Sequence, residues 1–218
     1  MSSENSETKS KRKLDPRTLL LIICSLLIFY GIFGLLKRWL STHGTDHPPT
    51  ISQNAVIPSE KPVSDNYSVP PDQPKQIVLP SINAKGYIQK VDLTKDGAVG
   101  SPDNVLMAGW YDRSIKPGNV GLSIIDGHVQ GYYRPGIFKQ LANLKQNDNF
   151  TVVYGDNSVR KFQVVSVNNI DENKAAQALF AKNSAIKQQL NLITCSGKFD
   201  KAQNEYLQRT IVVAKLVS

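Results

Sequence analysis

Hydrophobic residues are distributed differently in three parts of the chain. Residues 18–36 form an uninterrupted apolar run without a charged residue. As a helix this run would rise about 28 Å, close to the thickness of about 30 Å of a membrane hydrocarbon core. Residues 37–75 are mostly polar and rich in proline, without helical or strand periodicity. From residue 76 onward, short apolar runs alternate with turn residues. The pattern predicts a membrane-spanning helix, a proline-rich stalk and a folded domain.

The C-terminal part has the pattern of an all-β domain. Short apolar runs bounded by turn residues are typical of a barrel or a sandwich. Two segments, 135–144 and 174–189, show instead the helical spacing of apolar residues and predict two short helices. We expect eight strands that close into a β-barrel, at residues 76–79, 86–91, 105–108, 121–126, 149–154, 159–167, 190–194 and 210–217.

The apolar run is expected to remain in the protein as an anchor. A cleaved signal peptide would have a shorter apolar part that ends at small residues, whereas this run ends at Lys37 and Arg38. More basic residues precede the run than follow it, which predicts a cytoplasmic N-terminus and an extracellular folded domain. We therefore expect a single-pass protein of the cell membrane. Its parts are a cytoplasmic tail, an anchor, a flexible linker and a folded domain, at residues 1–17, 18–36, 37–75 and 76–218.

Composition excludes several classes of protein. The net charge is +8, but half of the excess lies in residues 1–38, and no arginine-rich helix or basic stripe with interleaved aromatic residues occurs. We therefore expect no nucleic-acid partner. The three histidines and two cysteines are scattered singly, without the spacing of a structural zinc site. No dense acidic cluster indicates calcium, and we expect neither a metal nor a cofactor.

Two residues with reactive side chains lie at the ends of predicted strands. Cys195 directly follows the apolar run 190–194, so its thiol is expected where the chain leaves the sheet. A lone cysteine is most often a small buried apolar residue, but an unpaired thiol outside the cell favours a nucleophile. A thiol nucleophile needs a basic partner. His128, which follows the run 121–126, is the only histidine of the folded domain.

Arg209 begins the last predicted strand. If the strands that hold Cys195 and Arg209 are antiparallel neighbours, the two residues share one edge of the sheet. A guanidinium there can stabilise both a thiolate and an oxyanion. Asp126 lies two residues before His128 and could orient its imidazole if the strand continues through Gly127. The alternative for Asp126 is a turn-forming residue.

Three stretches of the folded domain occur in the order found in a known enzyme family. Residues 192–195, Leu-Ile-Thr-Cys, resemble the end of a TLxTC motif, with Asn191 in place of the first threonine. Gly127 and His128 after an apolar strand resemble a histidine motif, and residues 209–214 resemble an arginine strand. Residues 76–218 thus resemble the sortases, which are membrane-anchored cysteine transpeptidases of Gram-positive-type cell surfaces.

The resemblance implies a closed eight-stranded barrel with a cleft for an extended sorting peptide of the LPXTG kind. It implies that Cys195 forms a thioester with this peptide and that His128 exchanges protons with the leaving and incoming amines. Arg209 would bind the oxyanion together with the backbone beside Cys195, at Thr194 and Ser196. The implied partners are surface proteins with a C-terminal sorting signal, and an amine of a cell-wall precursor or a pilin lysine.

The sequence leaves the subclass and the reaction outcome open. Residues 109–111, 117–118 and 195–200 resemble class E or F sortases most. A membrane-tethered cysteine hydrolase would use the same Cys195 and His128 and pass its thioester to water, because the choice of acceptor depends on the shape of the cleft. A surface β-barrel that binds a partner without catalysis is the second alternative.

Overall fold

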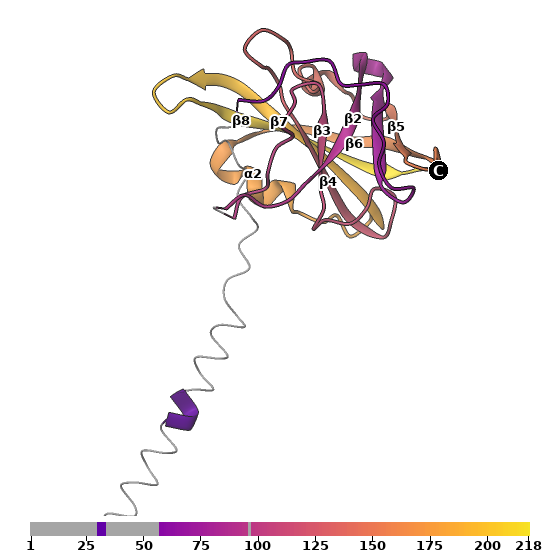
Figure 1. The fold of residues 1–218 in the computed structure, drawn as a ribbon. Coiled ribbons are helices and arrows are strands. Elements are labelled where there is room, and N and C mark those ends of the chain that lie inside the picture. The colour runs from indigo at the N-terminus through magenta and orange to yellow at the C-terminus, as the bar shows by residue number, and fades with distance from the viewer. Residues whose placement is uncertain (1–29, 34–56, 96) are drawn as a thin grey trace, which may run out of the picture. The chain divides into compact units, whose positions relative to one another are not determined.

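The computed structural model describes residues 30–33, 57–95 and 97–218 (Figure 1). The chain divides into two units, Met1–Asp46 and His47–Ser218. In the first unit, the described residues are helical and exposed. Within the described part of the chain, no helix is both long enough and apolar enough to cross a membrane.

Several predictions fall on residues that the structure does not describe. The expected tail, residues 1–17, lies outside the described residues, as does the expected anchor, residues 18–36, apart from its residues 30–33. The same holds for residues 37–56 of the expected linker. The anchor and its orientation therefore stay predictions.

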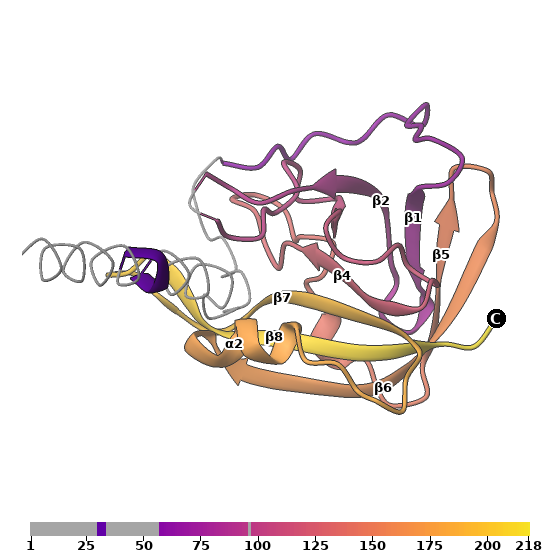
Figure 2. The same ribbon diagram turned by 90° about the horizontal axis from the view of Figure 1, so that it is seen from below.

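The second unit is a closed barrel of eight strands, which confirms the predicted architecture. Going around the barrel, the strands follow the order β1-β2-β3-β4-β7-β8-β6-β5 (Figure 2). The pairs β2 with β3 and β4 with β7 are parallel, and all other neighbours are antiparallel. The strands are β1 Pro74–Leu79, β2 Ala84–Val91, β3 Ala108–Tyr111, β4 Gly121–Gly127, β5 Asn149–Tyr154, β6 Val159–Asp171, β7 Gln188–Asp200 and β8 Glu205–Leu216.

The third strand lies later in the chain than predicted. The expected strand 105–108 overlaps β3 only at Ala108. The side chain of Asn104 explains the difference, because its oxygen accepts the Leu106 N–H at 2.9 Å and turns the chain there. The N–H of Val105 is bonded to a segment outside the sheet, at Ser59 O. These residues therefore cannot pair with β2.

The helical segments are shorter than predicted. Residues 174–189 were expected to form one helix, but the helix found there, α2, spans only Glu172–Leu179. It ends early because Gln189 accepts the N–H of Asn183 at 2.8 Å and donates to Ala181 O at 3.0 Å, so the following backbone is bonded to β7. The expected helix 135–144 retains only one 3₁₀ turn, η2 Leu141–Asn143, and a further 3₁₀ turn is η1 Pro80–Ile82.

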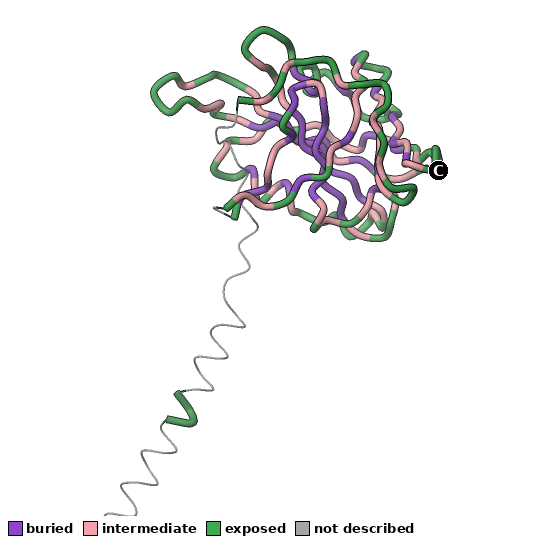
Figure 3. The backbone as a smooth tube through the Cα atoms, viewed as in Figure 1, coloured by how far each residue is buried: buried purple, intermediate pink, exposed green. Residues whose placement is uncertain are grey.

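The strands separate an apolar interior from an apolar outer face. Successive side chains of a strand point to opposite sides. Leu190 and Leu192 of β7 accordingly lie in the interior, which is the buried centre in Figure 3. Ile193 of β7 and Ile211 of β8 point outward and pack with Leu179 of α2. The outer face under α2 is therefore desolvated, and along β7 and β8 it continues toward Cys195 and Arg209.

The second half of the expected linker belongs to the folded unit. Residues 57–73 run along the surface of the barrel before β1 begins (Figure 2). The Tyr67 hydroxyl donates to Ile88 O at 2.8 Å, and the rings of Tyr67 and Tyr87 lie 5.0 Å apart. Proline-rich composition alone did not reveal these contacts, because extended chain without periodicity can still dock on a barrel.

Candidate active site

Cys195 and Arg209 are direct partners in the ladder between β7 and β8. Both lie two residues beyond the outward-facing pair Ile193 and Ile211, so strand alternation puts their side chains on the same outer face. β7 and β8 are antiparallel neighbours, which is the condition under which the sequence puts Cys195 and Arg209 together. β7 and β8 continue past this point as a hairpin that projects from the barrel (Figure 1).

A β-bulge twists the hairpin just beyond Cys195. The register between Ser196 and Phe199 contains one extra residue of β7. Gly197 lies there with φ +78, and a Cβ atom on it would come within 2.8 Å of Gln208 Oε1. The positive φ of Gly197 strains any residue that has a side chain at this position. The bulge re-aims the end of the hairpin relative to the strand that carries the thiol.

His128 directly follows β4, beside the middle of β7. β4 and β7 are parallel, and Asp126 of β4 lies opposite Ile193 of β7. His128 follows Asp126 by two residues and Cys195 follows Ile193 by two residues, so the two are at the same level of the sheet. The Thr194 hydroxyl donates to Gly127 O at 2.7 Å and joins the end of β4 to β7. The structure thus brings the end of β4, which His128 follows, beside the Cys195–Arg209 pair of β7 and β8. The expectation that Cys195 lies where the chain leaves the sheet is wrong, because β7 stays paired with β8 up to Asp200.

The imidazole of His128 is half-buried and bonded to a backbone carbonyl. Its Nε2 atom lies 2.7 Å from Pro102 O. A carbonyl oxygen only accepts hydrogen bonds, so Nε2 carries a proton in this arrangement. Nδ1 is then the ring nitrogen that can take up or release a proton.

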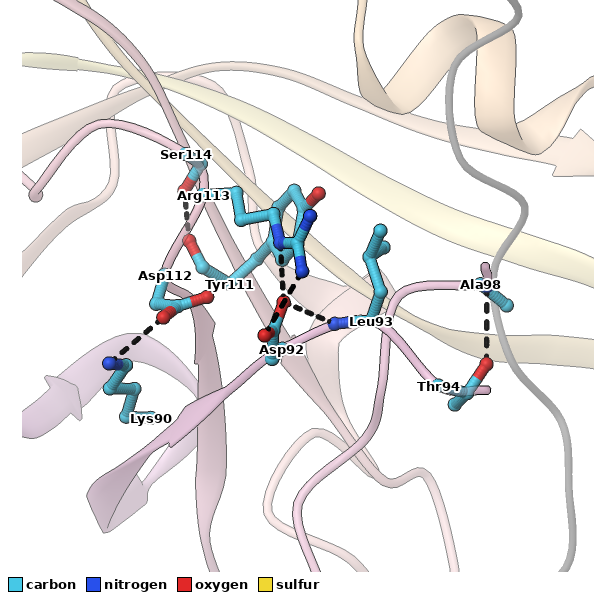
Figure 4. Close-up of polar contacts among 9 residues, drawn as sticks. All are labelled: Lys90, Asp92, Leu93, Thr94, Ala98, Tyr111, Asp112, Arg113 and Ser114. Atoms are coloured by element: carbon cyan, nitrogen blue, oxygen red, sulfur yellow. Dashed lines mark hydrogen bonds and ion pairs between the residues drawn. The ribbon is translucent and has the colours of Figure 1, made fainter. Parts of the chain in front are cut away.

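The segment that supplies Pro102 is held by an ion-pair cluster (Figure 4). Arg113 Nε and Nη2 lie 2.6 and 3.2 Å from the two carboxylate oxygens of Asp92. The backbone oxygen of Asp92 accepts the N–H of Gly100 at 2.9 Å. A bidentate arginine pair has a defined geometry. Asp92 therefore fixes the chain two residues before the carbonyl that contacts His128.

Asp126 is a buried carboxyl group on the outer face of β4. Burial raises its pKa, while the nearby charges of His128 and Arg209 and hydrogen bonds from Ser101 and the Gly127 N–H oppose that rise. β4 continues through Gly127, which is the condition under which Asp126 and His128 share a face. Asp126 thus belongs to the same cluster as the three predicted residues.

Arg209 is almost completely buried and held by several acceptors. Its Nη1 atom donates to Tyr206 O at 2.6 Å and to Gln208 O at 2.8 Å. Its Nη2 atom donates to Glu205 Oε1 at 3.1 Å and lies 3.9 Å from Glu172 Oε1 at the start of α2. The side chain of Arg209 is 1% exposed, so its orientation is set by these contacts and not by solvent.

The thiol of Cys195 is protonated at neutral pH. Burial raises its pKa to about 11. The positive charge of Arg209 opposes this rise, whereas Asp126 and Glu205 contribute to it. The neutral thiol therefore predominates in the resting site, and a reaction at sulfur requires removal of its proton.

Thr194 and Ser196 flank the thiol with their side chains on the other face of β7. Thr194 is buried and bonded to Gly127 O. The hydroxyl of Ser196 is buried and makes no hydrogen bond within the described part of the chain. The oxyanion role predicted for the backbone at these two residues stays a prediction.

The residue that departs from the threonine motif has a structural role. Asn191 is fully buried on the outer face, where its Nδ2 donates to Leu179 O at 2.7 Å at the end of α2. Its Oδ1 accepts from Gln189 Nε2 at 2.9 Å. Asn191 and Gln189 therefore attach α2 and the chain after it to β7. The contacts of Asn191 are with α2 and Gln189, and not with the thiol of Cys195.

Sequence reasoning did not single out Glu205 or Pro102. Glu205 lies four residues before Arg209, and this even spacing along a strand puts both on one face. That signal was available from the sequence once β8 was known to extend back to Glu205. Pro102 acts only through its backbone carbonyl, which leaves no signal in residue type.

A comparison with known protein families identifies this domain. The family model of the sortase domain matches residues 77–217, which is more than half of the chain. The chain belongs to the sortase family. No curated protein matches it.

Solved sortase structures share the fold. Pilus-related sortase C of Group B Streptococcus is similar with a TM-score of 0.54 at 17% identity, over 85% of this chain and 87% of that one. Sortase A from Corynebacterium diphtheriae is similar with a TM-score of 0.50 at 22% identity, over 67% of this chain. Sortase C of Streptococcus pneumoniae has a TM-score of 0.50 at 19% identity, over 67% of this chain and 70% of that one.

These likenesses establish the sortase barrel. The matched part spans 61% of the length of the corynebacterial sortase A. Sequence identities of 17 to 22% carry the fold, while the substrate has to be inferred from the site itself.

Proposed function

We propose that this sortase is a cysteine transpeptidase that cleaves an LPXTG-like sorting signal and transfers the acyl part to an amine. The supporting observation is the ladder pairing of Cys195 with Arg209 beside the end of β4, where His128 follows. A nucleophile, a proton carrier and a fixed cation around one point are the groups that acyl transfer requires. In this proposal the catalytic residues are Cys195, His128 and Arg209.

The first half-reaction forms a thioester. The sulfur of Cys195 attacks the carbonyl carbon of the scissile peptide bond, and its proton passes to Nδ1 of His128. Arg209 and the backbone at Thr194 and Ser196 stabilise the resulting oxyanion. The carbon–nitrogen bond then breaks, and the imidazolium gives its proton to the leaving amine.

The second half-reaction transfers the acyl group. The acceptor amine attacks the thioester carbon, loses a proton to His128 and displaces the sulfur of Cys195, which regains a proton. The proposed acceptor is an amine of a cell-wall precursor or a pilin lysine. A hydrolase would differ only in that water takes the place of the amine, so the product distinguishes the two.

The proposed location is the outer side of the cell membrane. It rests on the uncharged run 18–36 and on the excess of basic residues before it. The substrates would be surface proteins with a C-terminal sorting signal, delivered on the same side of the membrane as the barrel.

The test is a product analysis with the purified full chain. The chain is incubated with a fluorescent sorting peptide and a small amine, and the products are weighed by mass spectrometry. We expect an amide between the acyl part of the peptide and the added amine, and a thioester adduct on Cys195. If the free peptide acid is the sole product, the protein is a hydrolase and not a transpeptidase. Cleavage that persists in Cys195→Ala, or the absence of any cleavage and any adduct across a peptide library, would contradict the proposal.

A further inference from the structure

A short N-terminal segment, residues 57–61, contacts the chain on one side of His128. We call this segment the strap. Its Ser59 pairs in parallel with Asn104, with the Ser59 N–H donating to Asp103 O at 2.7 Å and the Val105 N–H donating to Ser59 O at 2.9 Å. The side chain of Asn104 is buried and donates to the carbonyl of the last strap residue at 2.9 Å. The strap therefore holds the backbone just after Pro102.

The strap also contacts the loop on the other side of His128. The carboxylate of Glu60 accepts the backbone N–H groups of Tyr132 and Tyr133, the latter at 3.1 Å. A Cβ atom on Gly131 would lie 2.5 Å from Glu60 Oε1, so the carboxylate packs directly on the backbone of this loop. Charge-assisted bonds of this kind are stronger than bonds between neutral groups. Glu60 is thus the strap's attachment to the loop 130–135.

Both attached segments bear directly on His128. Pro102 O accepts the Nε2–H of its ring at 2.7 Å. On the other side, Phe138 N–H donates to His128 O at 3.0 Å, and the loop is closed by a bridge between Gln130 and Pro135. A displacement of either segment would therefore move the imidazole or release its ring proton from the carbonyl.

We propose that the strap positions His128 for proton transfer, with Glu60 as the positioning residue. The strap links the Pro102 carbonyl and the loop 130–135 into one frame around the imidazole. This frame keeps the proton on Nε2 and leaves Nδ1 to exchange protons with sulfur and amine. The inference rests on the proposed function, since it assigns that proton exchange to His128.

The experiment compares three variants of the full chain. Glu60→Ala removes both bonds to the loop. Glu60→Gln keeps Oε1 as an acceptor without the charge. Asp65→Ala removes the same charge at an exposed side chain four residues after the strap and is the matched control. The readouts are the nitrogen spectrum of the His128 ring, hydrogen exchange of the Tyr132 and Tyr133 amides, and kcat and KM.

In the wild type we expect the Nε2–H form of His128. In Glu60→Ala we expect a mixture of both tautomers, amide exchange at Tyr132 and Tyr133 faster by about tenfold or more, and kcat lower by about tenfold with little change in KM. Glu60→Gln should restore most of the activity and the single tautomer. Asp65→Ala should behave as the wild type.

A wild-type tautomer together with a wild-type kcat in Glu60→Ala would overturn the inference. Equal effects of Glu60→Ala and Asp65→Ala would also overturn it, because charge and not position would then be responsible. The ring spectrum and the amide exchange require no turnover. They decide the role of the strap even if Cys195→Ala shows that the proposed reaction is wrong.

Discussion

The pH dependence of thiol reactivity tests the electrostatics of the site most directly. With a pKa of about 11 for Cys195, about 0.03% of the protein carries a thiolate at pH 7.5. An ordinary free cysteine with a pKa of about 8.5 is about 10% ionised at this pH. The difference in thiolate content is about 300-fold. A more basic thiolate is intrinsically more nucleophilic, by about tenfold here, which offsets part of this difference. Cys195 should therefore react about 30-fold more slowly than a free cysteine.

The assay is thiol–disulfide exchange with a small disulfide, in the full chain carrying Cys24→Ser so that Cys195 is the reacting thiol. The rate should rise about tenfold per pH unit between pH 7 and pH 10. At a given pH, the rate should be higher in Glu205→Gln, because this substitution removes a charge that raises the pKa of Cys195. The rate should be lower in Arg209→Ala, because this substitution removes the cation that lowers the pKa.

A rate that levels off below pH 9 would refute this reasoning, because it would show that the resting thiol is already ionised near neutral pH. Opposite shifts in Glu205→Gln and Arg209→Ala are an internal control. Steric restriction alone would slow the reaction equally at every pH. It would leave the pH dependence of the rate the same in both variants as in the unchanged protein.

Substitutions at three residues probe the contacts around the site. Arg209→Ala should lower kcat/KM for peptide cleavage by about 100-fold or more, and Arg209→Lys should not restore it, because an ammonium lacks the fork that makes the present contacts. Thr194→Val should lower the free energy of unfolding in urea by about 1–2 kcal/mol, since Gly127 O loses its buried donor. Asn191→Ala should leave Leu179 O without its donor and speed amide exchange in α2, while the reactivity of Cys195 stays close to that of the wild type.

Much of the barrel follows from apolar runs and turns. The strand β5 has the predicted bounds, because hydrophobic alternation and the turn after Tyr154 define both of its ends. The strand β3 was misplaced because Asn104 and Ser59, far apart in the chain, turn and bond the apolar residues that precede it. Tertiary contacts of this kind override a local pattern.

The candidate site was predictable to the extent that it depends on residue type and strand order. Cys195 and Arg209 meet because two apolar runs pair in an antiparallel ladder, which the sequence indicates. Glu205 was missed because β8 begins before its apolar part. The carbonyl of Pro102 and the strap contact of Glu60 depend on main-chain geometry, which no pattern of side chains encodes.

Burial of the thiol, together with the charges of Asp126 and Glu205, explains how a lone cysteine can persist on the outer side of a membrane, where we propose that this domain lies. The thiolate is the form that oxidants attack, so a thiol kept protonated by burial, Asp126 and Glu205 is protected at rest. In the proposed reaction, His128 accepts this proton when a substrate carbonyl lies beside the sulfur. A site that was electropositive throughout would react faster with peptides but would also be oxidised faster. The carboxylates thus oppose Arg209 in the resting state, and the sulfur becomes reactive only where a proton acceptor and a substrate are both in place.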